Sequence, residues 1–257
     1  TGMHLSPEFG MTFREIEKDG FTINKKIEML LSADTDSSVA KSTGLGLIGF
    51  ADAFKELKPD ILVVLGDRFE VLAASIAATL AKIPIAHISG GEKTTGAYDE
   101  TLRHSITKMS WWHFVATSEY EKRVIQLGEN PIRVFNVGGT GVDTIKKSKL
   151  LSKDILMKNT NINFLKKNLL VTFHPVTLEN NTSQQQFKIL LEVLSNFKEI
   201  YLIFTMPNSD SNGRVIMNMI KEFVSKNISR SIFFTSMGHL NYISCLQFVD
   251  AVIGNSS

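Results

Sequence analysis

The sequence predicts an α/β protein built on parallel sheets. Apolar, β-branched runs of strand length recur along the 257 residues and alternate with stretches of helical periodicity. This alternation is the pattern of right-handed βαβ units. The strand-like runs are also apolar throughout, which is typical of strands that are covered on both faces of a sheet.

The expected elements follow one another in a regular order. Strands are predicted at residues 61–65, 83–88, 114–116, 133–137, 169–173, 200–204, 232–234 and 251–253. Helical spacing of apolar residues is clearest over residues 69–81, 99–110, 119–127, 183–197 and 213–224. A lysine- and asparagine-rich segment at residues 146–167 interrupts the order. We interpret it as a solvated linker, with phosphate binding as the alternative. It divides the chain into two doubly wound domains, residues 1–150 and 151–257.

The composition excludes several classes of protein. A net charge of +2 is too small to indicate a nucleic-acid partner, and no apolar run has the roughly 20 residues that span a bilayer. The single cysteine, Cys245, has no partner for an internal disulfide, so we expect a cytoplasmic protein without a membrane partner. No metal-ligand spacing is visible. The chain begins at Thr1 and stops directly after an apolar run, so we expect it to be truncated at both ends.

Polar residues follow several predicted strands, where ligands bind in doubly wound sheets. Asp67 comes after the first strand and is either the N-cap of the next helix or an acid/base group. Arg68 beside it is a surface residue, a partner of Asp67 or an anion clamp. Glu92 follows two glycines and is either an exposed loop residue or part of a site. Asp99 and Arg103 lie four residues apart, as in an ordinary helical ion pair.

The histidines divide into two groups. His174 precedes a proline, which restricts its backbone, and it follows a strand, so it is a candidate for the site. We expect His87 and His113 to be core histidines and His104 to be structural or exposed. The glycine-rich loop at residues 138–141 lacks the full dinucleotide-binding fingerprint.

Six motifs in order carry a family resemblance. They are TGMHLSPEFG at residues 1–10, GDRFE at 66–70, HISGGE at 87–92, DETLRHSITK at 99–108, FHPVT at 173–177 and IGNSS at 253–257. The chain resembles the hydrolysing UDP-N-acetylglucosamine 2-epimerases of bacterial sialic acid synthesis. It also resembles the closely similar enzymes that act on a diacetamido sugar, UDP-N,N'-diacetylbacillosamine, in legionaminic acid synthesis, which is the alternative.

The resemblance implies two Rossmann-like domains of the glycosyltransferase-B type with a UDP-sugar in the cleft between them. The family reaction removes the C2 proton, expels UDP to give a 2-acetamidoglucal, and adds water to give N-acetylmannosamine, without NAD or a bound metal. The resemblance implies acid/base roles for Asp67, Glu92 and Asp99. It also implies that His174 is a catalytic residue, which contacts the leaving diphosphate or eases the departure of UDP. Substrate-binding roles are implied for Arg68, Arg103, Asn255, Ser256 and Ser257, with Arg103 near the diphosphate or the carboxylates. Members commonly pair, so a homodimer or homotetramer is expected.

Three other functions stay open. A UDP-sugar glycosyltransferase of the same fold explains the strands and the cleft but not three carboxylates in the first domain. A non-catalytic UDP-sugar-binding module predicts binding without turnover. A non-hydrolysing epimerase shares the carboxylates, although the forms GDRFE and GGE resemble the hydrolysing branch more closely.

Overall fold

The chain folds into two compact units. The computed structural model describes residues 1–33, 35–176, 178–179, 182–209 and 213–255. The first unit consists of Thr1–Leu5 and Ile23–Lys147, and the second of Ser6–Thr22 and Ser148–Ser257. Residues 6–22, which the sequence analysis assigned to the first domain, therefore pack with the second unit.

The first unit is built on a parallel sheet. Within the described residues its four strands run in the order β1 (Leu62–Leu65), β2 (Ile85–Ile88), β3 (Trp112–Val115) and β4 (Val134–Asn136). Because β1 pairs with β2 and β2 with β3 in parallel, their carboxyl ends meet at one edge of the sheet. The turns that follow β1 and β2 are consequently neighbours.

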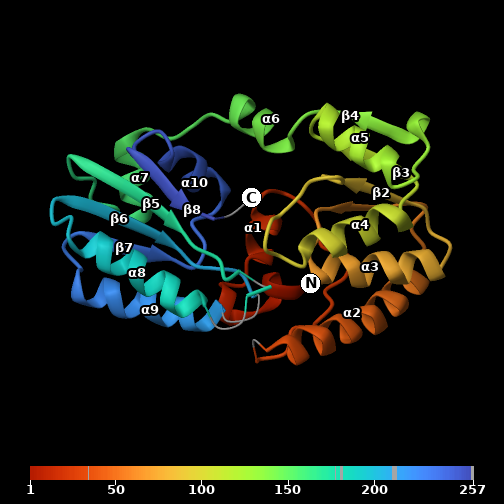
Figure 1. Ribbon diagram of the computed structural model, residues 1–257, viewed down its shortest axis with the longest axis horizontal. Helices are drawn as coiled ribbons and strands as arrows, with labels where there is room; N and C mark the ends of the chain where they lie inside the picture. Colours follow the sequence, from red (N-terminus) through yellow and green to blue (C-terminus); the bar gives the residue numbers. More distant parts are fainter. Residues whose placement is uncertain (34, 177, 180–181, 210–212, 256–257) are drawn as a thin grey trace. The chain divides into compact units, whose positions relative to one another are not determined.

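Helices α3 (Phe69–Leu80), α4 (Asp99–Met109) and α5 (Ser118–Gln126) contact the strands of this sheet, and α2 (Asp36–Leu57) packs on α3. Helix α2 packs along α3 and α3 along α4 (Figure 1). A buried cluster joins these helices to β1 and β2: Phe54, Val64, Ala77, Ala78, Ile85 and Ile106. The small side chains of α3 allow close packing, and this core fixes where α4 lies relative to the strand ends.

Helix α2 is the one long element that the sequence analysis did not identify. Its glycines weaken the helical pattern, since each glycine in a helix costs about 1 kcal/mol relative to alanine. The structure gives the reason for one of them. A Cβ atom on Gly46 would lie 2.6 Å from Cε of Met29, so the glycine admits the buried Met29 against the helix.

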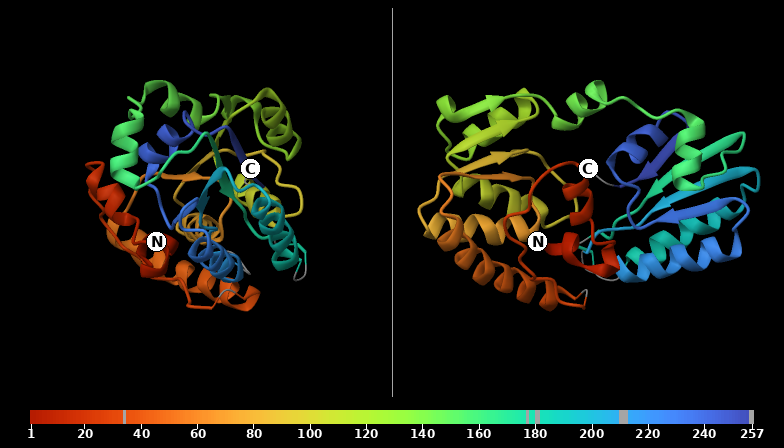
Figure 2. Two further views of the ribbon diagram at one scale, coloured as in Figure 1. Left: turned by 90° about the vertical axis from the view of Figure 1, so that its left-hand side faces the viewer. Right: turned by 180° about the vertical axis from the view of Figure 1, so that it is seen from behind.

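The second unit has a sheet of the same kind. Among the described residues its strands run in the order β7 (Ser231–Phe234), β6 (Ile200–Thr205), β5 (Lys167–Thr172) and β8 (Ala251–Gly254), all parallel. Helices α8 (Ser183–Ser195) and α9 (Gly213–Lys226) lie on one face, and α7 (Lys153–Thr160) and α10 (His239–Cys245) on the other (Figures 1 and 2). This unit is therefore doubly wound.

Short elements complete the chain. They are the 3-10 turns Gly2–Leu5, Pro7–Phe9 and Pro131–Arg133 and the helices α1 (Phe13–Lys18) and α6 (Thr140–Lys147). The predicted α/β class is confirmed, and each of the eight predicted strands is present with small shifts of its ends. The outer strands β1 and β8 leave Val63, Leu65 and Val252 more than half exposed.

Candidate functional site

The turn after β1 presents Asp67. The N-cap of α3 is Arg68, whose side chain makes no capping hydrogen bond. The alternative of Asp67 as a helix cap is therefore wrong. Its carboxylate instead forms an ion pair with Nη2 of Arg103. Arg68 contacts Glu70 through Nε at 3.2 Å, so its guanidinium is directed along its own turn.

The turn after β2 presents Glu92. Its backbone is left-handed at Ser89, with φ of 65°, and again at Gly91, with φ of 79°. A Cβ atom on Gly91 would lie 2.6 Å from the carbonyl oxygen of Tyr120. Both the left-handed backbone and the lack of space for a Cβ atom therefore require glycine at this position. On the other side, Nη1 of Arg123 donates to the Gly91 carbonyl oxygen, and its Nη2 lies 2.7 Å from Glu119. Helix α5 therefore holds this turn in place.

Replacing Gly91 with alanine is expected to destabilise the first unit by on the order of 3 kcal/mol, because the backbone strain and the clash add together. Urea unfolding measures this change. The matched control is Gly44→Ala in α2, where a Cβ atom meets nothing within 4 Å and no left-handed φ is required. Equal unfolding free energies for the Gly91→Ala and Gly44→Ala proteins would contradict this account of the turn.

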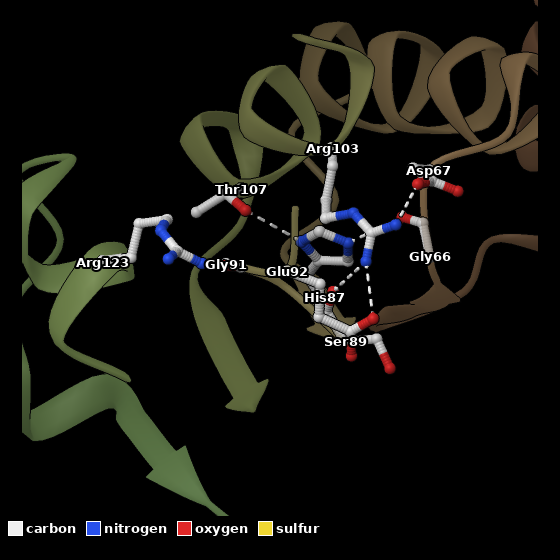
Figure 3. A network of polar contacts seen from close by, with 9 residues as sticks. All are labelled: Gly66, Asp67, His87, Ser89, Gly91, Glu92, Arg103, Thr107 and Arg123. Carbon is white, nitrogen blue, oxygen red and sulfur yellow. Dashed lines mark hydrogen bonds and ion pairs between the residues drawn. The ribbon is translucent and has the colours of Figure 1, made fainter. Parts of the chain in front are cut away.

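Arg103 joins the two turns. It lies on α4 and extends its guanidinium between them (Figure 3). Nη1 donates to Oε2 of Glu92 at 2.8 Å and to the backbone oxygen of Ser89 at 3.2 Å, while Nη2 pairs with Asp67. The sequence analysis expected Arg103 to pair with Asp99 on the same helix. Instead, Nη1 and Nη2 of Arg103 contact residues in the turns after two strands.

The charges in this cluster do not cancel. One guanidinium faces the two carboxylates of Asp67 and Glu92, whose side chains are 17% and 29% exposed, while that of Arg103 is 6% exposed. A buried arginine without a carboxylate partner is strongly unfavourable, so the arrangement holds both acids in place. Their remaining exposure leaves them open to a ligand. The cluster therefore combines fixed geometry with an accessible pair of carboxylates.

His87 is buried behind these turns. Its Nε2 lies 2.8 Å from the carbonyl oxygen of Gly66, and its Nδ1 lies 3.2 Å from Oγ1 of Thr107. Because a carbonyl only accepts, Nε2 carries the proton and Nδ1 accepts from the hydroxyl. Burial lowers the pKa of His87 to about 4, so the ring is neutral near pH 7. The prediction of a satisfied core histidine is confirmed.

His87 should make stability depend on pH. The unfolded ring takes up a proton below its ordinary pKa of 6.5, whereas the folded ring resists protonation down to about 4. The unfolded state therefore binds more protons as the pH falls through this window, and stability is lost. Between about pH 7 and about pH 5 we expect a loss of about 2 kcal/mol from this group. Urea unfolding of wild type and His87→Gln at both pH values measures it; equal losses in both proteins would contradict it.

The other first-unit candidates lie nearby. Asp99 is the first residue of α4, is partly buried and makes a polar contact of its own. His113 is buried on β3, and its Nε2 lies 3.1 Å from Glu129. Burial lowers the pKa of His104, and its neighbour Glu100 on the same face of α4 opposes that shift. Neither His104 nor His113 contributes to the Arg103 cluster.

In the second unit, His174 and Asn255 lie together at the ends of β5 and β8. Oδ1 of Asn255 accepts from the backbone N–H of His174 at 2.8 Å, and its Nδ2 donates to the His174 carbonyl oxygen at 2.7 Å. The asparagine side chain thus extends the pairing of the two strands and fixes the backbone of His174. Ser256 and Ser257 lie outside the described residues.

Three groups that hold this site together were not predicted from the sequence. They are the backbone carbonyl of Ser89, the hydroxyl of Thr107 and the guanidinium of Arg123. Thr107 lies one helical turn after Arg103 and so shares its face, which is the one available signal in the sequence. The other two depend on how a loop and a helix approach each other.

Two features are absent from the described part of the chain. No group of three or more His, Cys, Asp and Glu side chains there is arranged to hold a metal ion. No helix there has the length and apolar character that crossing a membrane requires. Burial raises the pKa of Cys245 to about 11, which makes its thiol a poor nucleophile.

Comparisons with known proteins agree over the whole chain. The profile of the UDP-N-acetylglucosamine 2-epimerase family matches residues 1–257. The GDP/UDP-N,N'-diacetylbacillosamine 2-epimerase (hydrolyzing) of Campylobacter jejuni is 44% identical over 257 residues, covering 100% of this chain and 67% of that protein. The polysialic acid biosynthesis protein P7 of Escherichia coli is 38% identical over 258 residues, covering 100% of this chain and 65% of that protein.

Solved structures show the same fold. The crystal structure of UDP-GlcNAc 2-epimerase from Neisseria meningitidis bound to UDP-GlcNAc matches with a TM-score of 0.75 at 18% identity, over 96% of this chain and 67% of that one. The predicted glycosyltransferase-B type of fold is thereby confirmed. The chain spans about two thirds of the length of the relatives it matches. By its match to the profile over every residue, the chain belongs to the UDP-N-acetylglucosamine 2-epimerase family.

Proposed function

We propose that this protein is a hydrolysing 2-epimerase of a UDP-2-acetamido sugar. The observation that carries the proposal is the pair of carboxylates, Asp67 and Glu92, held by Arg103 at the carboxyl ends of two parallel strands. The C2 hydrogen of an acetamido sugar is weakly acidic, so its removal needs a fixed base, and its return on the other face needs a fixed acid. A pair of accessible carboxylates supplies both groups.

The reaction proceeds in two steps. A base takes the C2 proton while the bond between C1 and the diphosphate oxygen breaks, so UDP leaves with the electron pair and a 2-acetamidoglucal remains. Water then adds its oxygen to C1 and gives a proton to a base, while an acid protonates C2 on the opposite face. We assign the proton transfers to Asp67, Glu92 and Asp99 together, without dividing the steps among them.

The remaining residues bind the nucleotide in this proposal. His174, Asn255, Ser256 and Ser257 contact the diphosphate, because they follow strands whose carboxyl ends are the usual ligand edge. The bridge from Asn255 supports this role, since it holds the backbone of His174 at the strand end. Arg68, which pairs with Glu70, and Arg103, which pairs with Asp67, contribute positive charge for binding the substrate.

Of the two candidate sugars, we propose the diacetamido sugar, UDP-N,N'-diacetylbacillosamine, ahead of UDP-N-acetylglucosamine. The sequence motifs fit both. The 44% identity to the C. jejuni enzyme supports the first, and the similarity to the polysialic acid protein leaves the second as the alternative. The choice depends on the groups at C4 and C6 of the sugar.

Proton NMR in heavy water tests the function. The protein encoded by the complete gene, including any residues that flank this chain, is incubated with each UDP-sugar in turn. We expect a free 2-epimerised sugar with deuterium at C2 and an equal amount of UDP. A product that keeps its UDP would indicate a non-hydrolysing epimerase, and UDP release only after an acceptor is added would indicate a transferase. No exchange with either sugar would rule the proposal out.

A further inference from the structure

Both peptide groups of Gly66, the residue before Asp67, are bound to β2. The Gly66 N–H donates to the carbonyl oxygen of Ile88 at 3.0 Å, and the Gly66 carbonyl oxygen accepts from Nε2 of His87 at 2.8 Å. The first of these bonds continues the parallel ladder of the sheet. The second is made by a side chain, so the direction of the peptide that joins Gly66 to Asp67 depends on one imidazole.

The same imidazole is held by α4. Thr107 is fully buried and directs its hydroxyl to Nδ1 of His87 at 3.2 Å. It lies one turn after Arg103 on that helix, so both side chains are on the face that meets the strand ends. Figure 3 shows the ring between Thr107 on one side and Gly66 on the other. His87 therefore connects the turn that carries Asp67 to the helix that carries Arg103.

We propose that His87 and Thr107 are positioning residues of the epimerase site, which set the Asp67 carboxylate against the Arg103 guanidinium. The inference rests on the proposed function. His87 is fully buried and does not face a substrate, so it acts through the Gly66 carbonyl and not on the reacting atoms. The Gly66 carbonyl can only accept, so it fixes the tautomer with the proton on Nε2, and the Thr107 hydroxyl supports this tautomer by donating to Nδ1.

If His87 had only a structural role, its replacement would have a different effect. A core histidine could lose a contact and cost stability while the site keeps its geometry. A positioning residue instead changes the chemical step, because a proton-transfer group displaced by about 1 Å can lose on the order of 10²-fold in rate. Binding of the UDP-sugar, which depends on other groups, would then change little.

The test compares Thr107→Val with Thr107→Ser in the protein encoded by the complete gene. Valine removes the hydroxyl at nearly constant volume, and serine keeps it. We expect Thr107→Val to lower kcat by on the order of 10- to 100-fold with KM nearly unchanged, and Thr107→Ser to stay close to wild type. Amide hydrogen exchange gives a second readout that needs no turnover. Exchange at Gly66 should accelerate in Thr107→Val and not in Thr107→Ser.

A second pair of variants, at His87, keeps the test decisive if a Thr107 variant fails to fold. His87→Gln keeps an N–H donor at the place of Nε2, whereas His87→Leu has none, so glutamine should restore part of the kcat that leucine loses. Thermal unfolding identifies any variant that has lost its fold. Wild-type kcat and unchanged Gly66 exchange in folded Thr107→Val would overturn the inference. Absence of turnover in wild type would instead overturn the proposed function, and exchange at Gly66 would then decide the positioning role alone.

Discussion

Asp67→Asn is expected to lower the turnover of the UDP-sugar by roughly 10²–10⁴-fold, which is the range that one proton-transfer group contributes. Asparagine has nearly the same shape as aspartate, and its oxygen can still accept from Arg103, so the turn is retained. It cannot take up a proton from carbon. Proton NMR in heavy water measures this directly, and deuterium incorporation at C2 should fall by the same factor as UDP release.

The matched control is Asp60→Asn. Asp60 is exposed and precedes β1 at its other end, so it undergoes the same change of charge away from the site. We expect Asp60→Asn to react like wild type. A wild-type rate of C2 exchange in Asp67→Asn would show that Asp67 moves no proton. Glu92→Gln provides a parallel comparison for the second carboxylate.

Arg103→Met is expected to destabilise the first unit by about 3 kcal/mol and to reduce turnover at least as far as Asp67→Asn. Removing one partner of a buried ion pair leaves the other uncompensated, at a cost of about 3–5 kcal/mol. The lower end applies here because the carboxylates of Asp67 and Glu92 keep some exposure. Urea unfolding and steady-state kinetics measure the two effects.

Two further variants separate charge from geometry at Arg103. Arg103→Lys keeps the positive charge but cannot reach both turns with a planar fork, so it should recover stability more than turnover. Adding Glu92→Gln to Arg103→Met removes one uncompensated carboxylate and should recover part of the lost stability. Lys122→Met, an exposed cation on α5, is the control for loss of a positive charge. Unchanged unfolding free energy in Arg103→Met would contradict this view of the cluster.

Much of the fold follows from local patterns. The eight strands are apolar runs bounded by polar residues, so their existence was predicted and only their ends moved. Helix α2 was not found because its glycines lower helical propensity. The benefit of one of them, Gly46, is a close contact with Met29 that no local pattern contains. The packing of residues 6–22 with the second unit likewise depends on contacts between residues that are far apart in the sequence.

The candidate site likewise has parts that follow from local sequence patterns and parts that depend on long-range contacts. Asp67 and Glu92 were candidates because each follows a strand, and adjacent parallel strands bring their ends together. The resemblance implied a place for Arg103 near the diphosphate or the carboxylates. Spacing alone favours an ordinary ion pair with Asp99 on the same helix, so the pairing of Arg103 with both Asp67 and Glu92 was not predicted. The pairing depends on the distance of α4 from the strand ends, which the buried contact of Ile106 with the core sets.

The position of Arg103 and Thr107 on one face of α4 limits how this protein can change during evolution. Each helical residue advances the chain by a rotation of about 100°. After an insertion or deletion of one residue between these two positions, only one of the two side chains could keep its place. Either the Arg103 guanidinium would stay at the strand ends while the Thr107 hydroxyl turned away from His87, or the hydroxyl would stay while the guanidinium turned away. Substitutions on the outer face of α4 carry no such penalty. We therefore expect related genes to vary freely in the outward residues of this helix and to preserve its length.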